Sequence, residues 1–225
     1  MEEKKPYFRG KIHLAAFYLT ISKSILYILT WTLIRGNKAI LIYLISQLIL
    51  FGVSSTYHTT TWKNERAEYL VRLIDHISIF ILISGTQTSV VLSLLPYTIV
   101  SKTIIMISWT ITLIGTLKIV LFRRLNHIFD TLVYILHGIS VVPFFKIIKA
   151  SVNTLDLTFI VMGGIVYVIG GIVYGYKKPD PYPFVFGYHE IFHVTTVLAN
   201  YCFFIPMFKQ YVTTLKEIKA VYIFY

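Results

Sequence analysis

Cysteine and charge are both scarce in this chain. Its 225 residues include a single cysteine, Cys202, which excludes an internal disulfide framework and a four-cysteine zinc site. Charged residues make up 14% of the chain and hydrophobic residues 56%, and the mean hydropathy is +0.70. A soluble domain does not have this composition, so the sequence predicts an integral, multi-pass membrane protein.

Acidic residues are especially few, with 10 against 21 lysines and arginines and a net charge of +11. A basic excess can indicate nucleic-acid binding, but these cations are spread over short connections between apolar runs. We interpret them as membrane-surface anchors and expect no nucleic-acid partner. The run after the basic segment 1–11 is too long for a signal-peptide core and lacks a clear cleavage site, so we expect a retained first span.

Seven apolar runs approach the roughly 20 residues that a bilayer-spanning helix needs. They cover residues 12–33, 39–57, 73–95, 99–122, 128–148, 157–174 and 188–208. The short connections leave no room for a second folded unit. We therefore expect one all-α, seven-helix transmembrane domain over residues 1–225, with a basic N-terminal segment (1–11) and a C-terminal tail (209–225) lying on the membrane surface.

The charges of the connections predict the orientation of the bundle. With the N terminus inside, eleven lysines and arginines fall on the inner side and eight on the outer side. Because cytoplasmic connections carry the excess of positive charge, this small bias favours an inside N terminus and an outside C terminus.

Two histidines, His189 and His193, stand four residues apart at the start of the last apolar run. On a helix this spacing stacks both imidazoles on one face, within reach of one metal ion. Ionisable groups are costly at membrane depth and usually mark a functional site, so the pair indicates ligand binding. Interfacial or helix-packing histidines are the alternative interpretation.

The number of crossings brings further polar residues to the same membrane face. His58 ends the second run and Asp75 opens the third, on the side where the last run begins. Six of the seven histidines lie at span ends on this side, and His137 alone lies within a span. Polar residues at helical spacing form three stripes, which should face the bundle interior. The stripes are Gln47, Ser54 and His58; Asp75, Ser78, Gly85 and Ser89; and His189, His193, Thr196 and Asn200.

Three segments resemble the signature segments of the progestin and adipoQ receptor family, which includes the haemolysin III proteins. They are residues 54–58 (SSTYH), residues 72–76 (RLIDH) running into 85–88 (GTQT), and residues 189–193 (HEIFH). The opening residues 6–13, the short gap between His58 and Asp75 and the absence of a long N-terminal domain are more similar to the haemolysin III branch. The resemblance implies seven transmembrane helices, a Zn²⁺ ion held by His58, His189 and His193, and a site that includes Asp75 and Ser54.

Three histidine ligands leave the fourth position of a tetrahedral zinc ion open for water. Zinc lowers the pKa of that water and polarises a carbonyl oxygen, while Asp75 would orient the water and accept its proton. Ser54, one turn before His58, would support the water or a ligand. The resemblance suggests hydrolysis of a lipid amide such as ceramide, which would enter sideways from the bilayer.

Several of these residues have plainer alternatives. The alternative for Asp75, against which we favour the site role, is a helix N-terminal acid that complements the macrodipole, and the alternative for Ser54 is a hydrogen bond to the preceding turn. Glu190 resembles the base of an HExxH motif, but a residue next to His189 points about 100° away around a helix, so we assign it no such role. We interpret the remaining histidines as structural or interfacial: His13, His76, His127 and His137.

One segment and one single position depart from the family pattern. Gln87-Thr88-Ser89 stands where Tyr-Thr-Pro or a similar sequence is usual, and Phe203 replaces a histidine common ten residues after the last ligand. Neither is a proposed ligand, so both bear on pocket shape and substrate.

Three functional classes remain open. The first is a zinc-dependent, ceramidase-like membrane amidohydrolase. The second is a non-catalytic receptor or lipid or metal homeostasis protein with a structural zinc and a lipid ligand. The third, a pore-forming haemolysin, fits least well because the polar groups cluster at one face and do not line a continuous path.

Overall fold

The chain folds into a bundle of membrane-spanning helices. The computed structural model describes residues 6–34, 38–122 and 127–223. Its elements are α1 (Lys11–Ile34), α2 (Lys38–Thr59), α3 (Glu65–Leu94), α4 (Ile99–Phe122), α5 (His127–Ile139), a short 3₁₀ turn η1 (Val142–Phe144), α6 (Phe145–Ser151), α7 (Thr154–Tyr176) and α8 (Tyr188–Ile223). Within these ranges seven spans are long and apolar enough to cross a membrane, with α5, η1 and α6 sharing one. The prediction of a seven-span, all-helical membrane protein is confirmed.

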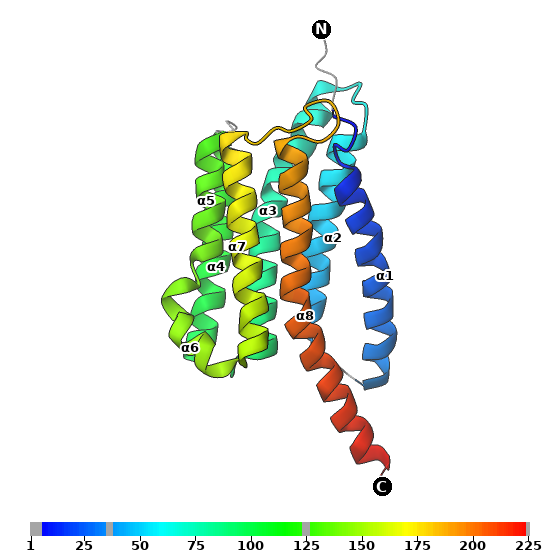
Figure 1. Cartoon of the computed structure of the whole chain (residues 1–225), viewed down its shortest axis with the longest axis vertical. Coiled ribbons are helices and arrows are strands. Elements are labelled where there is room, and N and C mark those ends of the chain that lie inside the picture. The colour runs from blue at the N-terminus through cyan, green and yellow to red at the C-terminus, as the bar shows by residue number, and fades with distance from the viewer. Residues whose placement is uncertain (1–5, 35–37, 123–126, 224–225) are drawn as a thin grey trace.

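Neighbouring helices in the chain pack side by side, and the last helix closes the bundle (Figure 1). α2 packs between α1 and α3, and α3 also packs against α4. α7 packs against α5 and α8, while α8 contacts both α1 and α3. α1 begins at the end of the bundle opposite to the end where α8 finishes, as an odd number of crossings requires.

The orientation in the membrane stays a prediction. Several of the cations on which it depends, Lys4, Lys5, Arg35, Arg123 and Arg124, lie outside the described residues.

Two helix boundaries differ from the apolar runs. α3 begins at Glu65, eight residues before the predicted start, because Asn64 caps it by accepting hydrogen bonds from the backbone N–H groups of Arg66 and Ala67. α8 continues past residue 208 to Ile223, so most of the predicted tail extends this helix. Pro206 lies inside α8, and the helix bends in this region (Figure 1).

The fifth span is broken, whereas an uninterrupted run was predicted. α5 ends at Ile139, and Pro143, which lacks a backbone N–H and cannot continue the helix, lies in η1. At the break, backbone carbonyl groups near the middle of the bundle lose their helical hydrogen bonds. They then require other hydrogen-bond donors, because no water reaches this depth of a bilayer. Gln87 of α3 is such a donor, since its Nε2 donates to the carbonyls of His137 (3.0 Å) and Gly138 (3.2 Å).

The polar stripes face the interior, as predicted. Gln47, Ser54, Ser78, Ser89 and Asn200 are all 2% exposed or less. Within the bundle, Asn200 of α8 accepts from Nε2 of Gln47 (3.0 Å) and donates to the Tyr167 hydroxyl (2.6 Å), linking α2, α7 and α8. These hydrogen bonds satisfy polar groups that have no access to water in a bilayer.

Candidate metal centre

Three histidines meet near the end of the bundle where α1 begins. His58 is the second-last residue of α2, and His189 is the second residue of α8. Because α2 and α8 run in opposite directions across the bundle, the end of one lies beside the start of the other. His193 follows one helical turn after His189 on the same face of α8, as the four-residue spacing predicts.

The three imidazoles form a compact triangle. One ring nitrogen of each histidine lies within 4.8 Å of one ring nitrogen of each of the others. The ring centroids of His189 and His58, and those of His189 and His193, are both 4.7 Å apart. His193 is 1% exposed and His58 is 8% exposed. No other group of three or more potential ligands of this kind occurs in the part of the chain that the structure describes.

This donor set fits a zinc ion. Zinc takes imidazole nitrogens at about 2.1 Å in a tetrahedral arrangement, which separates the ligand nitrogens by about 3.4 Å. The 4.8 Å limit on the observed nitrogen separations exceeds this value, so the imidazoles would move inward on binding the ion. Nδ1 of His193 is also buried without a hydrogen-bond partner among the described residues, which is costly unless something else binds this ring.

Asp75 lies beside the triangle. Its Oδ2 is 3.8 Å from Nε2 of His58, too far for a direct hydrogen bond. The residue is 8% exposed and stands ten positions (75 − 65) after Glu65, the first residue of α3. The helix macrodipole acts within the first turn, so complementing it does not explain a carboxylate nearly three turns into the helix.

Ser54 makes a contact that sequence reasoning did not anticipate. Its hydroxyl forms a 2.8 Å hydrogen bond with Nδ1 of His13, from α1. The His13 ring stacks on His193 with centroids 3.7 Å apart and planes 14° apart, and His13 is only 2% exposed. His13 therefore packs against the cluster, which agrees with its interpretation as a structural histidine, although its contact with His193 was not predicted. The crossing count placed it on the correct face, but no sequence pattern pairs it with His193.

Glu190 points away from the triangle, in agreement with the helical-angle argument. Its carboxylate is fully buried, accepts from the backbone N–H of Gly187 (2.8 Å) and pairs with Nε of Arg9 (2.5 Å). A carboxylate held by these two partners is a structural group at the start of α8. Arg9 was not singled out from the sequence, because its partner lies 181 positions away.

The other histidines lie outside the triangle. Nδ1 of His76 is hydrogen-bonded to the carbonyl of Arg72 (2.8 Å), one turn earlier in α3. His137 is fully buried between α3, α4 and α5, with Nε2 within 3.3 Å of the hydroxyls of Ser84 and Ser108. The interpretation of both as structural agrees with these contacts. The side chain of His127 lies outside the described residues.

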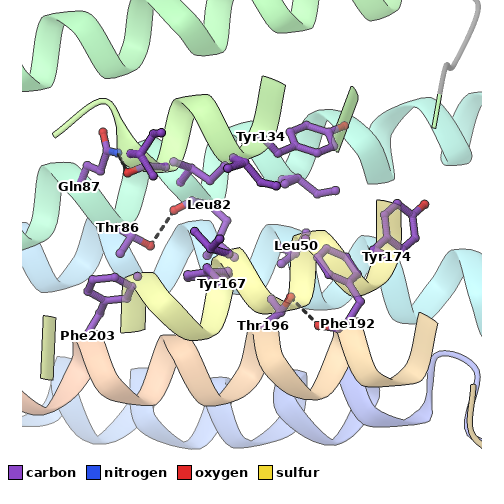
Figure 2. Close-up of a pocket in the computed structure, with 18 of the residues that line it drawn as sticks. Leu50, Leu82, Thr86, Gln87, Tyr134, Tyr167, Tyr174, Phe192, Thr196 and Phe203 are labelled. Atoms are coloured by element: carbon purple, nitrogen blue, oxygen red, sulfur yellow. Dashed lines mark hydrogen bonds between the residues drawn. The ribbon is translucent and has the colours of Figure 1, made fainter. Parts of the chain in front are cut away.

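A cavity of about 790 Å³ opens beside the triangle and continues toward the opposite end of the bundle, as far as Ile148 and Leu157. Its charged and histidine lining residues all lie at the triangle end: Arg9, His13, His58, Arg72, Asp75, His76, Asp130, His189 and His193. Beyond these residues the wall of the cavity is largely aromatic and aliphatic, and it includes Tyr167 and Phe203. Tyr134 and Phe192 line the space nearer the triangle (Figure 2).

Three polar residues along this wall donate their hydrogens to backbone carbonyls. Thr86 and Thr196 donate their hydroxyl hydrogens to the carbonyls of Leu82 (2.7 Å) and Phe192 (2.9 Å), as Figure 2 shows. The amide of Gln87 is turned to the broken end of α5. The cavity is thus polar at one end and apolar along the rest of its length.

The sequence has recognisable relatives. A family model described as "Haemolysin-III related" matches residues 1–204. The chain is 31% identical over 152 residues to the "Hemolysin-3 homolog" of Bacillus subtilis (strain 168), covering 68% of this chain and 67% of that protein. It is 28% identical over 140 residues to the "Hemolysin-3" of Bacillus cereus, covering 62% of this chain and 63% of that protein.

Proposed function

The chain belongs to the haemolysin III-related family, and from this premise we propose that it is a zinc-dependent hydrolase of long-chain lipid amides. One observation carries the proposal: three clustered histidines and a buried carboxylate lie at the polar end of a long apolar cavity. A receptor with a purely structural zinc would not need a carboxylate beside the metal ligands.

The residues divide into metal ligands and a proton acceptor. His58, His189 and His193 would hold the ion, which when bound supplies a Lewis acid for polarising a carbonyl oxygen and makes a water nucleophile available near neutral pH. Oδ2 of Asp75 would accept the proton released when water adds to the amide carbonyl and would return it to the leaving nitrogen. Its 3.8 Å separation from His58 Nε2 places the carboxylate beside the triangle, where a water held by the ion would be within its reach.

The cavity supports the choice of substrate class. Its volume of about 790 Å³ lies within the range of about 300–1,000 Å³ usual for ligand pockets. An acyl chain has no hydrogen-bonding groups, and the wall presents few to it, because the threonine hydroxyls are bound to their own helices. The carbonyl end of the same molecule would then lie beside the histidines.

Two glycines mark the side from which a lipid would enter. Gly138, at the end of α5, and Gly164, in the middle of α7, both line the cavity, and a Cβ atom at either would meet no heavy atom within 4 Å. α5 ends at Ile139, directly after Gly138. A substrate arriving from the bilayer would pass between α5 and α7 beside these two glycines, which carry no side chain.

The relatives' names refer to haemolysis, but the cavity gives little support to a pore. Ion conduction needs polar groups along the whole path, whereas here the charged lining residues are confined to one end.

The test is a hydrolysis assay. Purified protein, incubated in lipid nanodiscs with ceramides and other long-chain N-acyl lipids, should release free fatty acid. Treatment with a zinc chelator should stop the release, and added Zn²⁺ should restore it. Protein that contains zinc but releases no fatty acid from any amide in the panel would contradict the proposal and leave a receptor role.

A further inference from the structure

The five residues from Arg9 to His13, here called the N-terminal clamp, contact both helices that carry the triangle. The backbone just before the clamp is fixed to the α7–α8 connection, because the N–H groups of Tyr7 and Phe8 donate to the carbonyls of Phe184 (3.0 Å) and Val185 (3.1 Å). The clamp is thereby held across the end of the bundle where the triangle lies.

The first clamp contact fixes the start of α8. Arg9 Nε pairs with the fully buried Glu190 carboxylate, whose second oxygen accepts from the N–H of Gly187. A buried charge that loses its partner is strongly destabilising, so this pair holds the first turn of α8 to the clamp. His189 immediately precedes Glu190 and therefore moves with that turn.

The second contact is a close approach to His58. Gly10 has a φ of +78°, which favours glycine, and a Cβ atom at this position would lie 2.7 Å from Cβ of His58. Any larger residue would displace either the clamp or the His58 side chain. The glycine thus lets the clamp pack directly on the end of α2.

The third contact is the stack of His13 on His193. The 2.8 Å hydrogen bond with Ser54 of α2 orients the His13 ring, and the nearly parallel stack restricts rotation of the His193 ring. Groups of this kind, which fix ligand side chains without binding the metal, commonly change metal affinity by about 10–100-fold when removed.

We propose that the N-terminal clamp is a positioning element that holds His58, His189 and His193 in one coordination geometry. The inference rests on the proposed metal site. Arg9 positions His189 through Glu190. Gly10 packs directly on His58, and the His13 ring stacks on His193.

The test uses Co²⁺ as a probe, because its visible absorption reports coordination geometry and its titration reports affinity. Gly10→Ala should bind Co²⁺ at least about tenfold more weakly than the natural protein and shift the absorption bands. Gly175→Ala is the matched control, since a Cβ there makes only an ordinary contact, 3.4 Å from Cγ2 of Thr131, and it should behave like the natural protein.

A second comparison guards against a Gly10→Ala protein that fails to fold. Arg9→Met keeps the length of the side chain but removes its charge and should weaken Co²⁺ binding, whereas Arg9→Lys keeps a cation for Glu190 and should restore most of the affinity. His13→Ala should weaken binding as Arg9→Met does.

The outcomes separate the two proposals. If the natural protein binds Co²⁺ and Gly10→Ala, Arg9→Met and His13→Ala bind it equally well with unchanged spectra, the clamp proposal is overturned and the metal site stands. If Gly10→Ala does not fold, the Co²⁺ affinities of the Arg9 and His13 variants test the clamp proposal in its place. A natural protein that binds no Co²⁺ would overturn both the metal site and the clamp.

Discussion

Oδ2 of Asp75 lies 3.8 Å from Nε2 of His58, although the two residues come from different helices and neither is held by the other through a direct hydrogen bond. Both side chains are buried at one end of the cavity. Burying a carboxylate at this position in a membrane protein is energetically unfavourable, and such residues usually have a function.

Replacement of Asp75 by asparagine should reduce the hydrolysis rate without reducing the amount of bound metal. Because the amide keeps the shape but cannot accept the proton, fatty-acid release should fall by about 10²–10⁴-fold while bound zinc stays at the natural level. The control is Asp156→Asn: Asp156 is similarly buried but pairs with Lys209, and it should keep its activity. Equal rates for Asp75→Asn and the natural protein would remove Asp75 from the mechanism.

Substitution of Gly164 by phenylalanine should obstruct the cavity. The ring would project into space that is open beside Gly164, so release of fatty acid from long-chain amides should fall by about tenfold or more, equivalent to about 1.4 kcal/mol. Zinc content should not change, because Gly164 does not belong to the triangle. The assay compares Gly164→Phe with Gly164→Ala, and undiminished activity in the phenylalanine variant would argue against this route for the acyl chain.

Much of this architecture is readable from the sequence, because hydrophobic length and polar stripes follow directly from the demands of a bilayer. The stripe that contains Gln47, Ser54 and His58 is buried as its spacing predicts. The break at Pro143 was missed because the run from 128 to 148 has the full length of a span. The early start of α3 was missed because its first turns are polar, although Asn64 is a recognisable cap.

The candidate site was only partly predictable. The triangle depends on helix ends that a crossing count can bring together, and the choice of His58 came from the family resemblance. Arg9 and His13 could not be assigned, because their partners Glu190 and His193 lie about 180 residues away and a sequence pattern does not specify which side chains meet. Tertiary packing alone decides such contacts.

The hydrogen bonds of Asn200 should contribute measurably to stability. Its side chain contacts Gln47, Tyr43 and Tyr167 from two other helices. Interhelical hydrogen bonds in membranes contribute about 0.6 kcal/mol on average and up to about 1.7 kcal/mol, so Asn200→Ala should lower the free energy of unfolding by about 1–2 kcal/mol. Unfolding by SDS in mixed micelles measures this. Thr213→Ala, at an exposed position on the same helix, is the control, and equal stabilities of the two variants would contradict the prediction.

The orientation prediction can be tested with single cysteines in a Cys202→Ser background. With the N terminus inside, Thr61→Cys, between α2 and α3, should be protected from a membrane-impermeant maleimide in intact cells. Tyr97→Cys, between α3 and α4, should react, because the next connection lies on the opposite side. Both positions are exposed in the structure. The reverse labelling pattern would place the N terminus, and the candidate metal centre with it, outside.

The metal content of the purified protein tests the central claim most directly. Mass spectrometric metal analysis should find one zinc per chain in the natural protein, with most of it lost in His58→Ala, His189→Ala and His193→Ala. His76→Gln, on the same face but outside the triangle, should keep its zinc. Natural protein without zinc, or full zinc occupancy after replacement of any of the three histidines, would contradict the account.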